Sequence, residues 1–258
     1  MPFLTRPHCA LYYEVHGDLT GPRTPLVLAH GLGGNHLSWW QQLAHFAPSR
    51  ACVVFSHRGF ALSPEAPGGP GLAGFADDLL ALLDHLELHA PILVGQSMGG
   101  WTCTSHAAAH PDRLRALVLA CTTGAITHPE LDAIFTAHHA RELPALPEHV
   151  SPAAGPRLAR EQPAMNTLYN LVGDLTPGLD RDALTRALLA ARTVPLADSS
   201  PTWISSTTRR RKYSRPRRNV RAPKSRRSAR SLRPATLRAA SGRPKRRRTS
   251  STGTTSAR

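Results

Sequence analysis

A serine flanked by glycines is the residue of this chain whose surroundings point most directly to chemistry. The pentapeptide Gly95-Gln96-Ser97-Met98-Gly99 comes directly after an apolar run, residues 90–94, and opens a helix-like stretch, residues 98–109. A serine on a sharp strand-to-helix turn projects beyond the sheet edge, and this strained turn tolerates only small neighbours. The N–H groups at the start of the helix face developing negative charge. We therefore predict that Ser97 is a nucleophile on an elbow whose glycines are Gly95 and Gly99.

A second glycine-rich loop follows an earlier apolar run. His30-Gly31-Leu32-Gly33-Gly34 comes directly after residues 25–29 and reaches the same edge if both runs are parallel strands. We expect the backbone N–H groups of Leu32 and Met98 to form an oxyanion hole, in which each donor contributes about 10²–10³ in rate. We interpret His30 as a structural residue that braces the loop.

The apolar periodicity predicts the elements that hold these two loops. Short runs that are apolar on both faces are typical of buried strands, and helical spacing separates several of them. This alternation indicates an α/β fold, with a mostly parallel sheet and helices on both faces. The predicted strands are residues 11–15, 25–30, 51–57, 90–94 and 114–120, and the predicted helices are 75–86 and 98–109.

Three segments with different patterns follow one another along the chain. Residues 1–126 contain the strand and helix pattern and form the predicted core. Residues 127–198 contain helix-like pieces broken by proline and no clear strand, which indicates a helical cap. Residues 199–258 are rich in Arg, Ser, Thr and Pro. They have too little apolar surface to offset the entropy of ordering the chain, so we predict a disordered tail in place of further strands.

The ordered motifs of residues 25–124 resemble the α/β-hydrolase fold superfamily. The resemblance rests on His30-Gly31, on His57-Arg58-Gly59-Phe60 with Ser63, and on Gly95-Gln96-Ser97-Met98-Gly99-Gly100. It implies a serine hydrolase that cleaves an ester, lactone or related acyl bond of a small molecule. The serine argues against the dehalogenase and epoxide-hydrolase branches, which have aspartate there. Members that cleave carbon–carbon bonds or act as lyases keep the reaction class broad.

The resemblance also implies an acid and then a histidine after the nucleophile, and neither can be named here. All 14 histidines lie at or before His149, and no acidic residue follows Asp198. Four of the histidines that follow Ser97 fall in the predicted cap, where we interpret them as surface or packing residues. They are His128, His138, His139 and His149. The catalytic histidine and acid are therefore unknown, and the chain could be inactive as printed.

A shift of reading frame accounts for the missing partners. Pro234-Ala235-Thr236-Leu237 can be encoded by CCG GCC ACT CTC, and reading from the last base of the first codon gives Gly-His-Ser, the family's histidine signature. The same shift over residues 201–208 permits Pro-Thr-Val-Asp-Leu-Val-Asp-Asp, which resembles a late strand and its acid. The absence of lysine before Lys212 agrees with GC-rich coding. We hypothesise that the tail is the family's C-terminal part in another frame. An unbroken, AT-rich frame around the Pro201 codon would contradict this.

The charge distribution suggests a different class of function for the tail. The chain has a net charge of +15, but 20 of its 32 Lys and Arg residues lie between Arg209 and Arg258, and all 17 acidic residues lie at or before Asp198. Clusters such as Lys245-Arg246-Arg247-Arg248 bind nucleic acid without sequence preference and in a salt-dependent manner. Nucleic-acid binding through residues 209–258 is therefore an alternative function to hydrolysis. A hydrolase-fold scaffold without catalysis is a third one.

The remaining composition argues against several classes of protein. The four cysteines, Cys9, Cys52, Cys103 and Cys121, have neither a disulfide framework nor metal-ligand spacing. We expect no metal, no cofactor and no membrane span, and a cytoplasmic location. Cys52 and Cys121 fall in apolar runs, so we interpret them as small core residues. If the late strands are missing, an exposed sheet edge is expected. The substrate and the oligomeric state cannot be derived from these patterns.

Overall fold

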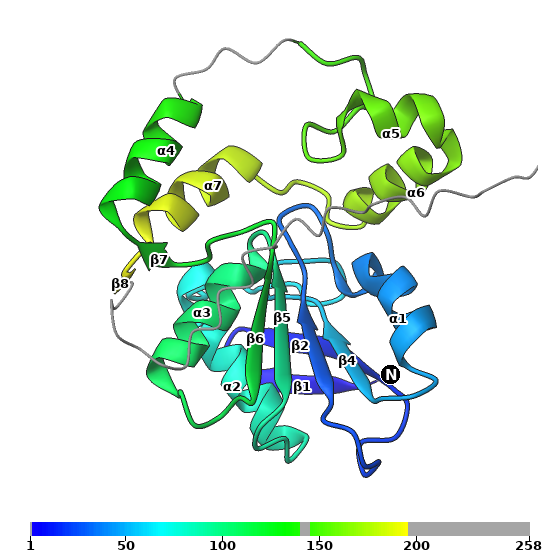
Figure 1. Ribbon diagram of the computed structural model, residues 1–258, viewed down its shortest axis with the longest axis vertical. Coiled ribbons are helices and arrows are strands. Elements are labelled where there is room, and N and C mark those ends of the chain that lie inside the picture. The colour runs from blue at the N-terminus through cyan, green and yellow to red at the C-terminus, as the bar shows by residue number, and fades with distance from the viewer. Residues whose placement is uncertain (1, 140–144, 196–258) are drawn as a thin grey trace, which may run out of the picture. The chain divides into compact units, whose positions relative to one another are not determined.

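Six strands form one sheet in the computed structural model, which describes residues 2–139 and 145–195 (Figure 1). Their order across the sheet is β1-β2-β4-β3-β5-β6. The strands β3 to β6 run parallel, and β2 pairs antiparallel with both β1 and β4. The mostly parallel α/β sheet predicted from the sequence is therefore confirmed. The strands are β1 Phe3–Arg6, β2 Cys9–His16, β3 Leu26–Ala29, β4 Cys52–Phe55, β5 Ile92–Gln96 and β6 Ala116–Ala120.

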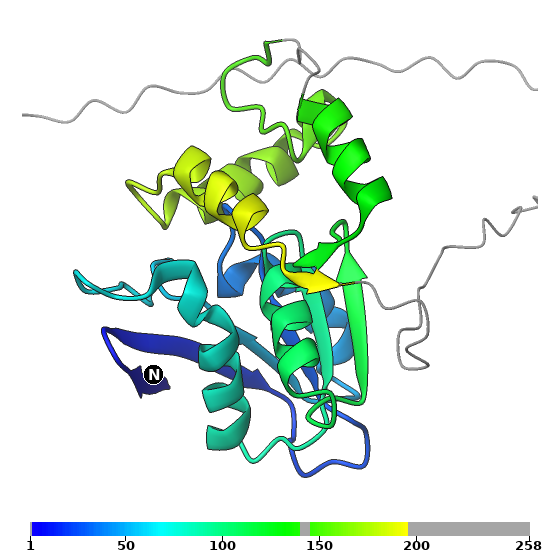
Figure 2. The same cartoon turned by 90° about the vertical axis from the view of Figure 1, so that its left-hand side faces the viewer.

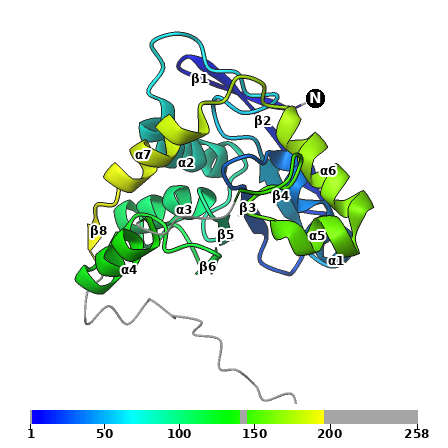
Figure 3. The same cartoon turned by 90° about the horizontal axis from the view of Figure 1, so that it is seen from above.

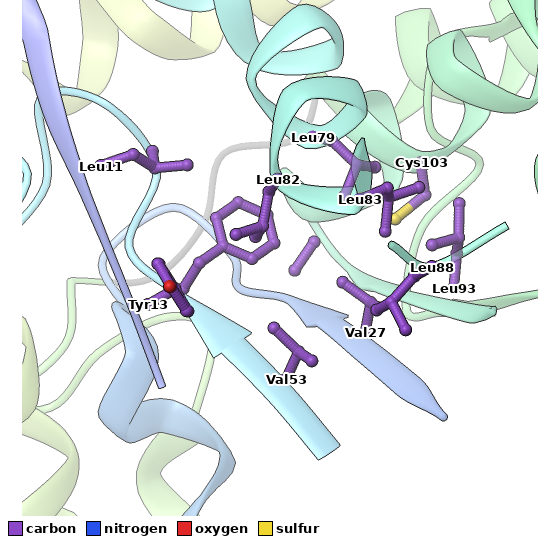
Figure 4. Packing of buried hydrophobic residues seen from close by; sticks show 12 residues of the cluster. Leu11, Tyr13, Val27, Val53, Leu79, Leu82, Leu83, Leu88, Leu93 and Cys103 are labelled. Carbon is purple, nitrogen blue, oxygen red and sulfur yellow. The ribbon is translucent and has the colours of Figure 1, made fainter. Parts of the chain in front are cut away.

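Helices cover both faces of this sheet, as the apolar runs predicted. Every residue of β3 and β4 is buried, because alternate side chains enter two different hydrophobic layers. On one face, Val27 and Val53 pack against Leu79 and Leu82 (Figure 4). On the other, Leu28 and Val54 pack against Trp39. The helical elements are η1 His36–Trp39, α1 Trp40–Phe46, η2 Gly71–Gly74, α2 Phe75–His85 and α3 Gly99–Ala109.

The strand register brings the two glycine-rich loops to one edge. Ala29, the last residue of β3, lies level with Gly95 of β5 and with Phe55 of β4. Parallel strands end at the same edge, so the loops after β3, β4 and β5 leave the sheet side by side. These are the loops that contain the predicted oxyanion-hole residue, the His57-Arg58 segment and the nucleophile.

A helical segment follows the sheet, and a small pair of strands joins its two ends (Figure 2). The elements are β7 Ile126–Thr127, α4 Pro129–His139, α5 Gly155–Glu161, α6 Pro163–Asp174, α7 Arg181–Ala190 and β8 Val194–Pro195. The prediction that this segment contains no strand was wrong, since Ile126 pairs in parallel with Val194. A two-residue strand is too short to show an alternating pattern. The boundaries predicted for core, cap and tail stay predictions.

The structure differs from the sequence predictions in two further places, the strand β1 and the residue after β6. The sequence did not predict β1, because Phe3–Arg6 is short, only half-buried and contains a charge. Cys121 is exposed and not in the core, since β6 ends at Ala120 and Cys121 turns away with a backbone φ of +53°. Cys52 is buried, as predicted.

A buried ion cluster joins the loop after β4 to α2. Arg58 donates to both carboxylate oxygens of Asp78, at 2.6 Å each, and Arg6 donates to Asp78 at 2.9 Å. Arg58 also donates to Glu65, whose carboxylate accepts from the Gly71 backbone. Arg58 and Asp78 are almost fully buried, so this network positions the loop that leaves the sheet beside the elbow.

Predictions for residues 199–258 fall outside the described residues. These include the disordered tail, the alternative reading frame and the nucleic-acid contacts. No helix in the described ranges has both the length and the apolar character to cross a membrane.

Candidate active site

Ser97 lies on a strained turn between β5 and α3. Its backbone φ is +48°, in the left-handed region that non-glycine residues rarely occupy, and its N–H donates to the Ala120 carbonyl at 3.0 Å. This conformation costs of the order of 1–3 kcal/mol and is typical of functional residues. The strand-to-helix context predicted from the pentapeptide is present, because β5 ends at Gln96 and α3 begins at Gly99.

The elbow glycines are required because backbone approaches them closely. A Cβ atom on Gly99 would lie 2.1 Å from the Ala29 carbonyl oxygen, and one on Gly95 would lie 2.6 Å from the Gly99 carbonyl oxygen. These contacts are with backbone, which cannot move aside as a flexible side chain can. The two glycines therefore let α3 start directly over the end of β3, beside the glycine-rich loop.

The loop after β3 lies directly against Ser97. A Cβ atom on Gly31 would lie 3.1 Å from the Ser97 Cβ, so no side chain fits between the loop and the elbow. The side chains of Leu32 and Met98, the two predicted oxyanion-hole residues, share one hydrophobic cluster. Within the described ranges, neither residue's backbone N–H donates to another protein group. Both donors are therefore available to a ligand at the elbow.

His30 braces this loop through both ring nitrogens. Its Nε2 accepts from the His57 backbone N–H at 3.0 Å, which leaves Nδ1 to carry the proton and donate to the Gly31 carbonyl at 2.9 Å. Burial lowers the pKa of His30 to about 4. An imidazole with both nitrogens occupied and no access to solvent has a structural role, in agreement with the sequence interpretation.

His57 lies against His30, with 4.4 Å between the ring centres. Burial, and next the neighbouring His30, holds the pKa of His57 well below its ordinary range. Its Nε2 is 2.9 Å from the Thr102 hydroxyl, and its Nδ1 has no partner among the described residues. The sequence motif contained His57 but gave no sign of this buried pair.

The pH dependence of stability should follow from these buried histidines. The pKa of His30 is about 4 in the folded chain, and an unfolded histidine titrates near 6.5. Between these values the unfolded chain binds a proton that the native chain does not. The free energy of unfolding therefore falls as the pH drops from about 6.5 toward 4, by about 3 kcal/mol for a shift of this size.

Urea unfolding at pH 7.5, 5.5 and 4.5 measures this dependence. His30→Asn should reduce the acid-induced loss, whereas His89→Gln, at an exposed position, should leave it unchanged. Equal pH dependence of the unfolding free energy in the natural chain and in both variants would show that His30 does not cause the acid-induced loss.

The described residues show no hydrogen bond that would identify a general base for Ser97. No histidine or carboxylate there forms a hydrogen bond with the Ser97 side chain. His128 accepts from the Glu130 backbone at the start of α4, and the exposed His149 pairs with Glu148 at 3.4 Å. The side chains of His138 and His139, and all of Asp198, fall outside the description.

The helical segment contacts residues that follow β3 and β4 and a residue of α3; Figure 3 shows its helices from above. Asn35, after β3, donates to the Val172 carbonyl at 2.7 Å, and Trp101 of α3 donates to the Leu188 carbonyl at 2.7 Å. The Ala61 backbone, after β4, donates to Thr176 at 3.1 Å. Leu188 also enters the hydrophobic cluster that contains Met98. The segment therefore fixes the surroundings of the elbow, which is how a cap would influence the choice of substrate.

Comparison with known proteins identifies the family. Residues 24–162 match the family model described as alpha/beta hydrolase fold. Over 110 residues the chain is 36% identical to a protein of Caulobacter sp. (strain K31) named as a carbamate hydrolase, RutD, which covers 42% of this chain and 41% of that protein. It is 32% identical over 123 residues to 3-oxoadipate enol-lactonase 2 of Acinetobacter baylyi, covering 48% and 45%. The chain spans less than half the length of these curated relatives.

The similarity to solved structures covers a larger share of the chain. A hydrolase from Pseudomonas aeruginosa PA01 is similar with a TM-score of 0.55 and 25% identity, over 76% of this chain and 73% of that one. The enol-lactonase from Burkholderia xenovorans LB400 shares the fold with a TM-score of 0.52 and 23% identity, over 75% and 73%. With more than half of its residues matched by the family model, the chain belongs to the α/β-hydrolase fold family.

Proposed function

We propose that this protein is a serine hydrolase acting on an ester, a lactone or a related acyl bond of a small molecule. The observation that carries the proposal is Ser97, held at a φ of +48° with the Gly31–Leu32 loop against it. The names of the relatives support the bond type, because a carbamate and an enol-lactone both undergo attack at a carbonyl carbon.

Each part of the elbow then has a role in acyl transfer. The Ser97 Oγ attacks the carbonyl carbon, and the carbonyl oxygen gains negative charge as the tetrahedral intermediate forms. The N–H groups of Leu32 and Met98 donate to that oxygen, and the N-terminus of α3 adds a favourable field. The serine proton must pass to a base, which the described residues do not supply.

We also propose that the missing base and acid are encoded in another reading frame of the segment from Pro201 onward. In that frame a Gly-His-Ser triplet replaces residues 234–236, and a strand-like segment with an acid replaces residues 201–208. The chain as printed then retains only the catalysis that the oxyanion hole and substrate binding supply, about 10³–10⁴ over the uncatalysed reaction.

A fluorescent fluorophosphonate tests the identity of the nucleophile. The printed chain should label slowly and at Ser97 alone, because the elbow presents the hydroxyl without activating it. Ser97→Ala should abolish the labelling, and Ser49→Ala, at an exposed serine after α1, should leave it unchanged. Peptide mapping of the adduct to another serine would contradict Ser97 as the nucleophile.

A further inference from the structure

One arginine of the helical segment lies against the glycine-rich loop of the candidate active site. A Cβ atom on Gly33 would lie 3.4 Å from both the Cζ and the Nη2 of Arg181, and 3.6 Å from its Nη1. Because three atoms of the planar group are almost equally distant, the flat face of the guanidinium lies toward Gly33. Gly33 directly follows Leu32, the proposed oxyanion-hole donor. Arg181 is therefore beside the oxyanion hole, although it comes from the other end of the described chain.

The conformation of the loop leaves room for this guanidinium. The Gly34 N–H donates to the Gly31 carbonyl at 3.0 Å, so Leu32 and Gly33 form the corner of a tight turn. Gly33 has a φ of +102°, a conformation that glycine adopts without strain and other residues rarely adopt. A side chain at this corner would meet Arg181, so the glycine serves both the turn and the contact.

The packing of α7 directs Arg181 toward the loop. Leu184 and Leu188 of this helix belong to the hydrophobic cluster that also contains Leu32. Residues that are three and seven positions apart lie on one face of a helix, so Arg181 shares the face that packs on the core. A Cβ atom on Gly173 of α6 would lie 3.4 Å from the Arg181 Nη2. The loop and α6 therefore both border the guanidinium and limit its movement.

The charge and the N–H groups of Arg181 have no partner in the described part of the chain. The side chain donates no hydrogen bond there, and none of the ion pairs among those residues includes it. The adjacent Asp180 carboxylate caps α7 instead. Outside the described ranges the printed chain has only two acidic residues, Glu142 and Asp198. Contact with Gly33 occupies the face of the guanidinium and leaves its N–H edge, on an exposed residue, available to a ligand.

We propose that Arg181 binds a carboxylate of the substrate, so that the protein acts on acyl compounds that carry a free acid group near the scissile carbonyl. The proposal rests on the acyl-transfer function proposed above. Guanidinium and carboxylate are both planar and pair through two parallel N–H···O bonds. Consecutive Cα atoms are about 3.8 Å apart, so a carboxylate on Arg181 lies roughly 5–10 Å from the Leu32 N–H. Half-esters of short dicarboxylic acids have this separation.

The surroundings of Arg181 favour a carboxylate over a phosphate group. Asp180 and Asp182 flank Arg181 in the sequence, and both are exposed. A phosphate monoester carries a charge of about −1.5 to −2 at neutral pH. One guanidinium leaves part of that charge uncompensated beside two carboxylates, whereas it balances the single charge of a substrate carboxylate.

Two phosphonate probes test the proposal on the full chain as printed. Both are neutral at phosphorus, with an ethoxy and a p-nitrophenoxy group, and have a short alkyl chain that ends in a carboxylate in one probe and in a carboxamide in the other. The Ser97 Oγ bonds to phosphorus, the bond from phosphorus to the aryl oxygen breaks, p-nitrophenolate leaves and the Oγ proton passes to water. The carboxylate probe should label Ser97 about tenfold faster than the amide, as a charged hydrogen bond on an exposed residue allows. Intact mass of the protein measures both rates.

Variants of two arginines separate this contact from the general attraction of a basic chain for an anion. Arg186 is exposed on the same helix, five residues and about 140° around the axis from Arg181. Arg181→Gln should lower the ratio of the two rates to about one. Arg186→Gln removes the same charge and should leave the ratio of the natural chain. Arg181→Lys should give an intermediate ratio, because an ammonium group lacks the planar fork.

The outcomes distinguish this proposal from the proposed function. Equal ratios for Arg181→Gln and Arg186→Gln would overturn it, and so would a natural chain that reacts no faster with the carboxylate probe. In both cases, labelling by the amide probe that Ser97→Ala abolishes would leave the proposed function intact. If neither probe labels Ser97, the proposed function fails and the role of Arg181 fails with it.

Discussion

Expression of the chain with one nucleotide inserted at the end of the Thr202 codon is expected to raise the rate of fluorophosphonate labelling at Ser97 by about 10⁴-fold or more. The frame that results would supply the Gly-His-Ser triplet and the preceding acid in the order that the family requires. The size of the effect follows from serine hydrolases in general, where removal of the base costs 10⁴–10⁶ in the chemical step.

Two matched variants separate the proposals that this experiment combines. In the reframed protein, Ser97→Ala should abolish labelling, and alanine at the histidine of the new triplet should return the rate to that of the printed chain. Fast labelling of the printed chain would disprove the reading-frame proposal and leave Ser97 as the nucleophile. A reframed protein that folds and does not label would disprove the role of Ser97.

Asp78→Ala should destabilise the described fold by about 3–5 kcal/mol. Asp78 is 1% exposed and accepts two 2.6 Å bonds from the buried Arg58 and one from Arg6. Its removal leaves the Arg58 guanidinium buried with only Glu65 as a charged partner, and an unpaired buried charge is the costly half of a broken ion pair. Urea unfolding at pH 7.5, followed by circular dichroism, measures the loss.

Asp84→Ala is the control on the same helix. Asp84 also accepts a 2.6 Å bond from an arginine, Arg113, but its side chain is 56% exposed. Exposed pairs contribute about 0–1 kcal/mol because water and salt screen them. Equal losses for the two aspartates would show that burial does not decide the energy here.

The sequence was most informative where a local pattern determines the structure. The elbow could be predicted because its glycines, its serine and the strand before it are contiguous in residues 90–99. The strands β3 and β4 could be predicted because burial on both faces requires unbroken apolar runs. The loop after β3 was assigned to the elbow from the edge rule for parallel strands, and the contact of Gly31 with Ser97 agrees with it.

Long-range polar contacts could not be predicted in this way. Asp77 and Asp78 are adjacent in the first turn of α2, and both suit the helix dipole equally well. Only the folded chain shows that Asp78 is buried beside Arg58, twenty residues away. The use of both His30 nitrogens depends in the same way on the His57 backbone.

All six strands of the described sheet lie within residues 3–120. Every strand of that sheet, and the Ala120 carbonyl that accepts from the Ser97 N–H, precedes the cap in the chain. Chains fold from the N-terminus as they emerge from the ribosome. Ser97 can therefore adopt its strained backbone conformation before the residues beyond the helical segment are translated. An altered downstream frame would then leave the elbow intact while removing its chemistry. Natural selection would act on the lost turnover and not on the geometry of Ser97.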